Sequence, residues 1–325
     1  MTQMTNQIPP EQERFMRILH PYALKQHLRV LNGGTRFVHY SSADAAMSIL
    51  RNKEVWMRNS SCMNDFLEVR YGLDRLYRAY RDTETGKKFQ AVLNRIFDKV
   101  TIDIERVFNS WTPHLLLNTY FTCVSEHDDS EDAFGRLSMW RAYGGAASVA
   151  FVLNNSVFLN PSGEGLKAYA SPIAYLDDQA FEKQLGEIGE NISKESDFLR
   201  TQGREATIGR IFNVLMFAAV CTKHLGFAEE REWRVVYCPA LGESPYLKKE
   251  IRVISDVPQP IYKIPLENIA EADLRASIPD LLDRIIIGPT QYPFVLGQAF
   301  EQLLTEAGVQ DAANKIRISD IPLRR

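Results

Sequence analysis

The stretch that decides the fold reads Arg231-Glu232-Trp233-Arg234-Val235-Val236-Tyr237. Its density of β-branched and aromatic side chains predicts a strand. Because side chains alternate along a strand, Glu230, Glu232 and Arg234 should point to one side and the intervening residues to the other. This strand should therefore have one ionic side and one apolar side.

Helices and strands alternate irregularly on either side of this stretch. Strands are predicted at 36–40, 54–57, 119–124, 147–153, 166–175, 251–254, 261–265, 284–287 and 315–318, and the longer helices at 11–31, 66–109, 182–199, 205–223 and 293–307. Since no regular strand-helix-strand repeat appears, we predict an α+β fold with a central mixed, mostly antiparallel sheet flanked by helices. We expect a helical segment at 1–34 and a single α+β domain at 35–325, with a helical insertion around 66–110.

Composition narrows the class of protein. The chain has 325 residues, of which 45% are hydrophobic and 24% charged, and its net charge is −3. These values are typical of a soluble globular protein and give no sign of duplex nucleic-acid or membrane binding. The polar N-terminus lacks the features of a secretory signal, so we expect a cytoplasmic protein. Four scattered cysteines without a CxxC pair predict neither disulfides nor structural zinc, and we expect no metal.

The sequence lacks the short signatures of phosphate-loop, dinucleotide-binding, zinc-protease and serine-hydrolase sites. Three polar clusters remain. The first joins His39, Tyr40 and Ser41, at the end of a predicted strand, with Asn64 and Asp65 before the helical insertion. An imidazole at a strand end can hold a ligand hydroxyl or amide, or it can be a half-buried ring satisfied by a backbone carbonyl. Asn64 and Asp65 suit either ligand binding or a turn that caps the next helix.

The second cluster contains Trp140 and Tyr143, which are three residues apart and should share a helix face. Aromatic rings on such a face either pack in the core or offer a flat surface for a nucleobase or nicotinamide ring. We expect core packing for Trp140. Tyr143 is the better ligand contact, because Gly144 and Gly145 follow it and allow close approach to the backbone.

The third cluster spans Lys223 to Val235, and within it Glu230, Glu232 and Arg234 are the candidate site residues. Two carboxylates beside an arginine can form an ion network in a cleft or in the interior. A carboxylate held in this way can stabilise the positive charge that develops on a sugar carbon during glycosyl transfer. The same residues could instead form ordinary salt bridges on a solvated edge strand.

Taken together, the clusters resemble a bacterial family known as domain of unknown function 2971. The resemblance runs in order along the chain from residue 36 and rests on Val38-His39-Tyr40-Ser41-Ser42, Ile49-Leu50, Val55-Trp56-Met57, Asn64-Asp65 with Glu68, Met139-Trp140 with Tyr143-Gly144, Phe227 with Glu230, Glu232 and Arg234, Ile286-Ile287-Gly288-Pro289, and 319–324. The family name implies no activity.

A more distant resemblance is to ADP-ribosyltransferases of the His-Tyr-Glu type. It implies that NAD is the substrate, that His39 with Tyr40 and Ser41 holds the NAD amide or ribose, and that Tyr143 stacks on nicotinamide. Glu230 or Glu232 would then hydrogen-bond the ribose while the glycosidic bond loosens. The sequence departs from this pattern in its helical insertion, and Asn64, Asp65 and Arg234 have no assigned place in it. Such an enzyme, cleaving NAD or modifying a macromolecular acceptor, would suit a toxin or an antiviral defence effector.

Two other classes of function stay open. The first is a non-catalytic module whose polar cleft binds a nucleotide or a protein partner. The second is a nuclease or phosphodiesterase in which Asp65, Glu68, Glu230 and Glu232 surround a divalent ion, since clustered carboxylates suit Mg²⁺.

Overall fold

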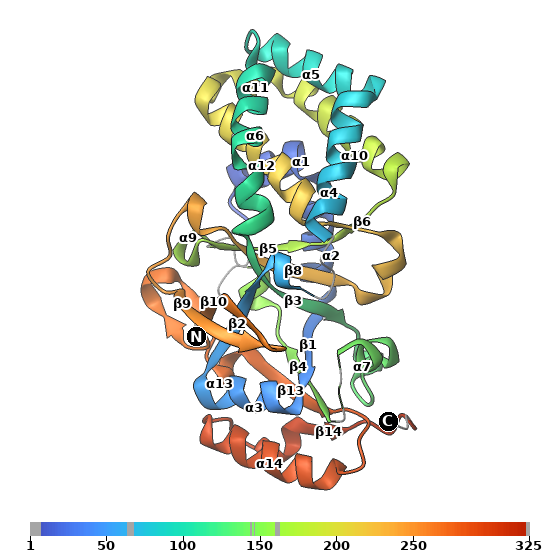
Figure 1. Ribbon diagram of the computed structural model, residues 1–325, viewed down its shortest axis with the longest axis vertical. Coiled ribbons are helices and arrows are strands. Elements are labelled where there is room, and N and C mark those ends of the chain that lie inside the picture. Colours follow the sequence, from blue (N-terminus) through green and yellow to red (C-terminus); the bar gives the residue numbers. More distant parts are fainter. Residues whose placement is uncertain (1–7, 64–67, 144, 146, 160–162, 323–325) are drawn as a thin grey trace.

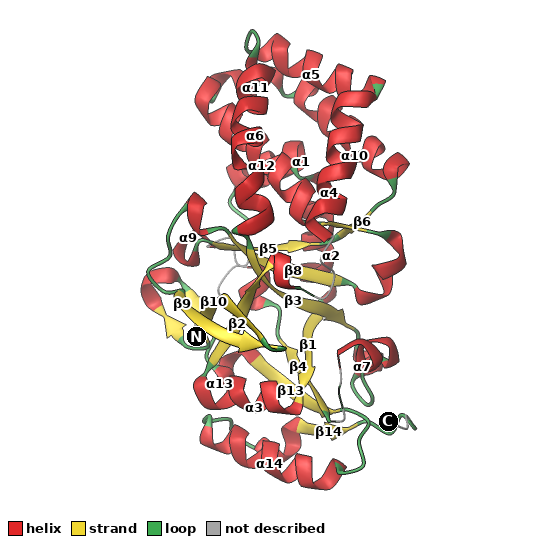
Figure 2. Cartoon of the chain, in the orientation of Figure 1, coloured by secondary structure: helices red, strands yellow, loops and turns green. Residues whose placement is uncertain are grey.

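A large sheet crosses the middle of the molecule, and helices pack at both of its ends (Figures 1 and 2). The computed structural model describes residues 8–63, 68–143, 145, 147–159 and 163–322. The sheet has ten strands: β1 (Arg36–Ser42), β2 (Glu54–Asn59), β3 (Tyr120–His127), β4 (Ser148–Leu153), β5 (Ala168–Pro172), β8 (Glu232–Tyr237), β9 (Lys248–Ile254), β10 (Val257–Pro265), β13 (Leu282–Ile287) and β14 (Ile316–Ile318).

The strand order is β14-β13-β4-β1-β3-β2-β10-β9, and β8 lies between β3 and β5. The neighbours in this sheet are antiparallel except β13 and β14, which run parallel. Two small two-stranded sheets add β6 (Ala174–Tyr175) with β7 (Thr222–Lys223), and β11 (Asn268–Ile269) with β12 (Leu274–Arg275). The predicted α+β fold, with a mixed and mostly antiparallel sheet, is confirmed.

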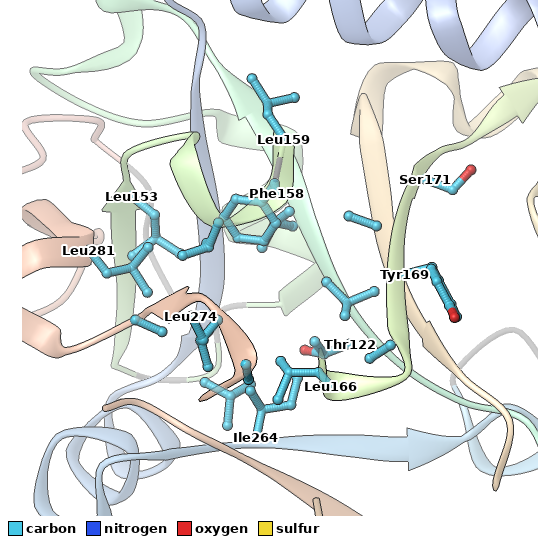
Figure 3. A pocket seen from close by; sticks show the side chains of 18 of the residues that line it. Thr122, Leu153, Phe158, Leu159, Leu166, Tyr169, Ser171, Ile264, Leu274 and Leu281 are labelled. Atoms are coloured by element: carbon cyan, nitrogen blue, oxygen red, sulfur yellow. The ribbon is translucent and has the colours of Figure 1, made fainter. Parts of the chain in front are cut away.

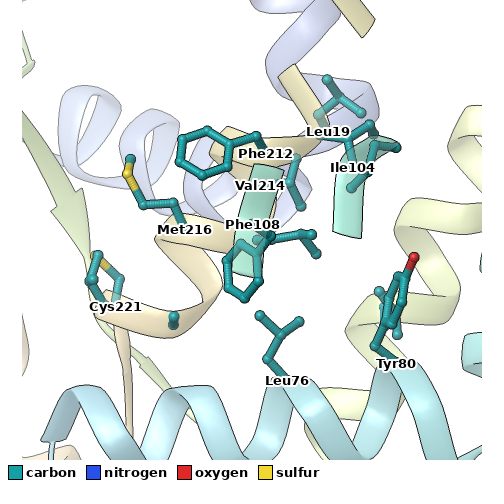
Figure 4. Close-up of a cluster of buried hydrophobic side chains, with 14 of the residues drawn as sticks. Leu19, Leu76, Tyr80, Ile104, Phe108, Phe212, Val214, Met216 and Cys221 are labelled. Atoms are coloured by element: carbon teal, nitrogen blue, oxygen red, sulfur yellow. The ribbon is translucent and has the colours of Figure 1, made fainter. Parts of the chain in front are cut away.

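Helices gather mainly beyond one end of the sheet, at the top of Figure 1. This helical lobe contains α1 (Pro10–Leu19), α4 (Glu68–Tyr77), α5 (Glu84–Ile96), α6 (Val100–Leu117), α10 (Asp178–Lys194), α11 (Ser196–Thr201) and α12 (Arg204–Val220). Their apolar stripes enclose the largest buried cluster, in which Leu76, Phe108 and Phe212 meet (Figure 4). The predicted insertion is therefore present as α4–α6, but it extends to Leu117 and is completed by helices from a later part of the chain.

Four further helices cover the opposite end of the sheet. They are α3 (Ala43–Asn52), α7 (Leu137–Tyr143), α13 (Ile278–Leu281) and α14 (Pro293–Glu306). The remaining α-helices among the described residues are α2 (Pro21–Gly33), α8 (Ser156–Leu159) and α9 (Gly163–Leu166). Leu50 of α3 and Phe300 of α14 pack on one face of β4 and β13. Trp140 of α7 packs on the other face against Tyr40 and Ile286. Both faces of this part of the sheet are thus covered.

Strand β8 is central, which excludes the alternative of a solvated edge strand. Its register places Glu232 opposite Ser125, Trp233 opposite Val124 and Arg234 opposite Cys123. Arg234 is fully buried, and Trp233 packs edge-on against Phe37 with 5.2 Å between ring centroids. The charged side chains of this strand therefore lie inside the protein and need partners there.

In the described part of the chain, no helix is long and apolar enough to cross a lipid bilayer. Cys62, Cys123, Cys221 and Cys238 are not joined in disulfide bonds; Cys221 and Cys238 are buried, and Cys62 and Cys123 are partly buried.

Candidate functional site

A chain of charged groups begins at the buried middle of β8 and ends near the surface. Lys223 Nζ, on β7, donates to Glu230 Oε2 at 2.6 Å and to Glu232 Oε2 at 3.1 Å. Arg234 Nε donates to Glu232 Oε1 at 2.7 Å, and Arg234 Nη1 donates to the Val220 carbonyl at 2.6 Å. We call Lys223, Glu230, Glu232 and Arg234 the β8 ion cluster. Its two acids and two bases compensate one another.

Exposure in the β8 ion cluster rises in one direction. The side chains of Arg234, Lys223 and Glu232 are 0%, 4% and 6% exposed, whereas that of Glu230 is 17% exposed. Buried charges are tolerated only when they are paired and hydrogen-bonded, and the three inner groups meet this condition. The inner groups therefore fix the outer carboxylate of Glu230, which is the part of the β8 ion cluster nearest to the surface.

Glu230 does not lie on the strand, contrary to the sequence-based expectation. Strand β8 begins at Glu232, and Glu230 ends a short 3-10 helix, Leu225–Glu230. The break is at Arg231, whose φ of 46° is left-handed. Glu230 still joins the two strand residues, because Lys223 lies between the carboxylates of Glu230 and Glu232.

Arg136 holds the backbone that carries Glu230. Its Nη1 donates to the carbonyls of Glu229 at 2.9 Å and Glu230 at 3.2 Å, and its Nε donates to Glu131 Oε1 at 3.0 Å. Arg231 forms ion pairs with Asp128 and Glu131. These contacts anchor the left-handed turn from outside the β8 ion cluster, so the position of Glu230 is fixed through both its side chain and its backbone.

Tyr143, at the end of α7, lies beside Glu230. Its hydroxyl donates to Glu230 Oε1 at 3.3 Å, and the residue is 39% exposed. Burial of the hydroxyl, together with the nearby charge of Glu230, raises the pKa of Tyr143, which keeps the phenol protonated and able to donate. Trp140 is fully buried, and its Nε1 donates to the Phe134 carbonyl at 2.8 Å. The predicted division between a core Trp140 and an accessible Tyr143 is present in the structure.

The two carboxylates of the β8 ion cluster have opposite pKa shifts. Burial opposes ionisation of Glu232, but the charges of Arg234 and Lys223 outweigh it and lower the pKa of Glu232 below its usual range. Burial raises the pKa of Glu230, and the charge of Glu232 adds to this effect, although Lys223 partly offsets both. Glu232 is therefore the more firmly ionised of the two carboxylates, and Glu230 is the one that binds a proton more readily.

His39 points away from this cluster. Val38 pairs with Ser125, and Ser125 pairs with Glu232, so these residues share one side of the sheet and His39 lies on the other. Its Nδ1 lies 3.0 Å from the Cys123 carbonyl, and burial lowers the pKa of the ring. The expected meeting of His39 with Tyr143 and Glu230 therefore does not occur, because alternation along β1 sends the imidazole to the opposite face.

Tyr40 and Ser41 also have structural surroundings. The hydroxyl of the buried Tyr40 accepts from the Arg136 backbone N–H at 2.8 Å, and its ring meets Trp140 with centroids 4.7 Å apart. Tyr40 thus supports the residue that anchors Glu230. Ser41 pairs with Val149 in the sheet, while the neighbouring Ser42 caps helix α3. Asn64 and Asp65 lie outside the described residues.

Three participants in the site were not singled out from the sequence. They are Lys223, Arg136 and Tyr175, whose hydroxyl accepts from the Glu232 backbone N–H at 2.8 Å. A signal existed for Lys223, because a lysine that directly follows the apolar stretch 211–221 needs an acid nearby. Arg136 and Tyr175 lie in segments whose spacing carries no comparable signal.

The β8 ion cluster is not arranged as a metal site. Lys223 Nζ occupies the space between Glu230 and Glu232, where a bridging cation would have to bind. Within residues 8–63, 68–143, 147–159 and 163–322, no group of three or more His, Cys, Asp or Glu side chains is placed to hold a metal ion. The described carboxylates are thus better suited to acid-base or electrostatic roles than to binding Mg²⁺.

Residues 139–235 match the model of a family described as "Protein of unknown function (DUF2971)". The match supports the resemblance to this family that the sequence suggested, over this part of the chain. The matched segment begins in α7 and ends in β8, so it contains Tyr143 and the whole β8 ion cluster but not His39. No curated protein and no solved structure matches the chain.

Proposed function

We propose that the chain is an enzyme that breaks the glycosidic bond of NAD, as a glycohydrolase or an ADP-ribosyltransferase, with Glu230 as its reactive carboxylate. The observation that carries this proposal is the placement of Glu230. It is partly exposed beside an accessible aromatic ring, and it is held by Tyr143 and Lys223 at the end of a compensated ion chain. An anchored carboxylate costs little reorganisation when charge develops on a substrate, which is the requirement for electrostatic catalysis.

Each residue then has a distinct role. The Tyr143 ring provides a surface for the nicotinamide or adenine ring. Glu230 accepts a hydrogen bond from a ribose hydroxyl and stabilises the positive charge that forms at the ribose carbon. As the carbon–nitrogen bond breaks, its electron pair leaves with nicotinamide, which becomes neutral. Water or an acceptor hydroxyl then bonds to the ribose carbon, and Glu230 takes the proton of that nucleophile.

Glu232 and Arg234 support this chemistry without touching the substrate. Both side chains are almost completely buried behind Lys223. Arg234 holds the Glu232 carboxylate, the negative charge of Glu232 keeps the Lys223 ammonium in place, and Lys223 in turn orients Glu230. In this proposal Tyr143 and one glutamate keep the roles that the distant resemblance implies, and His39 takes no part.

The test compares Glu230→Gln with Glu229→Gln, because Glu229 is an exposed neighbour of the same charge. Wild-type protein is incubated with NAD, and nicotinamide release is followed by mass spectrometry. We expect Glu230→Gln to lose about 10²–10⁴-fold in turnover and Glu229→Gln to retain it. Glu229→Gln should unfold at the wild-type temperature, and Glu230→Gln should stay folded but unfold at a lower temperature, because Gln keeps a hydrogen bond to Lys223 and loses the ion pair.

Two results would contradict the proposal. Full NAD turnover by Glu230→Gln would remove Glu230 from the chemistry. Stoichiometric retention of NAD by the wild-type protein, without any product, would make the site a nucleotide-binding module instead of an enzyme.

A further inference from the structure

A large cavity lies on the side of the sheet opposite to the β8 ion cluster. Its volume is about 660 Å³, and its lining includes His39, Thr122 and Val235 from strands β1, β3 and β8. Figure 3 shows its apolar part, where side chains from several strands and loops point toward a common space. The volume lies within the roughly 300–1,000 Å³ that is usual for small-molecule sites.

Most of the cavity wall is apolar. Phe151 and Leu153 line it from β4, Ile264 from β10, and Leu274 and Leu281 from the segment before β13. Carbon side chains of this kind offer water no hydrogen bonds, so a cavity that they surround is poorly hydrated and favours an apolar ligand. This part of the cavity cannot compensate the phosphate charges of a dinucleotide.

The helices that line the rest of the cavity supply basic side chains. His20 and His27 project from the α1–α2 pair, and Arg210 and Asn213 project from α12, one turn apart. His20 meets the Phe217 ring edge-on at 6.2 Å. The cavity therefore combines an apolar region with a helical wall that carries hydrogen-bond donors.

Two of these polar groups have no hydrogen-bond partner among the residues that the structure describes. His27 is nine-tenths buried, with 9% exposure, and its Nε2 makes no hydrogen bond. The Nε of Arg210 is likewise buried and unpaired, and its guanidinium lies 3.3 Å above the Phe15 ring. Leaving a buried polar group unsatisfied costs about 1–3 kcal/mol. A ligand that brings an acceptor, and above all an anionic one, recovers this cost at a cationic guanidinium.

We propose that this cavity binds a small carboxylate with an apolar body, such as a medium-chain or aromatic acid. The apolar body occupies the space bounded by Phe151, Leu153 and Leu281, and the carboxylate accepts hydrogen bonds from Arg210 and His27. This site is separate from the one proposed for NAD, because His39 and Glu232 lie on opposite sides of the sheet.

The test uses decanoate, with 1-decanol as an uncharged probe of equal chain length, in calorimetric titrations of the full chain below the micelle concentration. We expect decanoate to bind one molecule per chain and at least tenfold more tightly than decanol. Arg210→Met should abolish this preference, because it removes the guanidinium but keeps an apolar side chain of similar length. Arg200→Met, at an exposed position on α11, should leave the preference unchanged.

A second variant tests the cavity itself. Ala170 lines the space from β5, and Ala170→Phe should fill part of it and weaken both probes by at least tenfold. Thermal unfolding of each variant shows whether it is folded; Arg210→Gln replaces Arg210→Met, and Ala170→Leu replaces Ala170→Phe, where the first choice does not fold. Equal binding of decanoate and decanol, or decanoate binding that is unchanged by both Arg210→Met and Ala170→Phe, would overturn the proposal. Because NAD turnover is measured independently with Glu230→Gln, neither result depends on the other.

Discussion

The two sides of strand β8 differ in how their buried polar groups are paired. On one side Glu232 and Arg234 are buried charges, and each has its partners within hydrogen-bonding distance. On the other side Val235 faces a cavity whose basic lining includes two donors without partners. The ion-cluster side is satisfied by the protein itself. The cavity side leaves both volume and hydrogen-bonding capacity for another molecule.

From this difference we infer which residues on each side of β8 carry the proposed functions. In the β8 ion cluster the satisfied groups act as a support, and Glu230, the most exposed of the four, is the residue to which we assign the proposed chemistry. In the cavity the donors themselves, on His27 and Arg210, are the available groups. The comparison predicts that the two sides respond differently to loss of charge, to acid and to added volume.

Among the changes considered, removing a buried charge should lower the free energy of unfolding the most. Replacing Arg234 by Met removes one of the two cations that hold the buried Glu232 carboxylate, and breaking a buried pair in this way costs about 3–5 kcal/mol. Urea unfolding of Arg234→Met measures the change in the free energy of unfolding. The control is Arg252→Met on β9, because Arg252 is 45% exposed and pairs with Glu250 at the surface. Its effect should stay within about 0.5 kcal/mol.

The double variant Glu232→Leu/Arg234→Met sharpens this prediction. It removes both charges of the inner pair, so it should be less destabilised than the sum of the two single variants. A simple sum would mean that the pair is not coupled. Stability of Arg234→Met close to that of Arg252→Met would mean that the β8 ion cluster does not support the fold.

Lowering the pH should reduce the stability contributed by the two sides of β8 in different pH ranges. Burial lowers the pKa of His20 from 6.5 to about 4. Between these values the unfolded chain binds more protons than the folded one, so the stability contributed by the neutral ring is lost as pH falls from 6.5 to about 4. The pKa of Glu232 is lowered from 4.5, so its contribution is lost only as pH falls below that value.

His20→Phe tests the upper range, since it keeps the edge contact with Phe217 and removes the titration. We expect wild-type protein to lose about 2 kcal/mol more than this variant between pH 6.5 and pH 4. The pKa values of His27 and His39 are also lowered by burial, so the variant should keep part of the acid sensitivity. Replacement of the exposed His114 by Phe is the control. Identical pH profiles for His20→Phe and wild type would contradict the assignment.

The sequence predicted the fold better than it predicted the site. The composition of β8 and the mixed order of elements suffice to predict the α+β sheet, because each depends on local patterns. Tyr143 lies beside Glu230, as the distant resemblance implied, and the burial of Arg234 decides between two alternatives that the sequence left open. The turn at Arg231 was missed, because nothing in the local composition indicates a left-handed residue there; distant acids on another loop hold it.

The misplacement of His39 has a different cause. Order along the chain does not determine which side of a sheet a residue occupies. The side that His39 takes relative to Glu232 depends on the register of β1 with β3 and of β3 with β8, and these pairings join segments about a hundred residues apart. A shift of one residue in either pairing would have brought the imidazole to the ion-cluster side. Alternation within one strand was therefore predictable, whereas the relation between two strands was not.

The smallest effect on stability is expected when a side chain beside the cavity is enlarged, and such a substitution tests whether the cavity is empty space. Val235→Ile adds one methylene on the cavity side and should change stability by less than about 0.5 kcal/mol. Val152→Ile is the matched control, because Val152 is fully buried on the ion-cluster side of the sheet, within the cluster that contains Trp140. The same methylene should cost about 1–3 kcal/mol there, since a well-packed core accepts extra volume only by straining side chains. If urea unfolding gave both variants the same cost, the space beside Val235 would be filled in solution, and the contrast between the two sides of β8 would rest on charge alone.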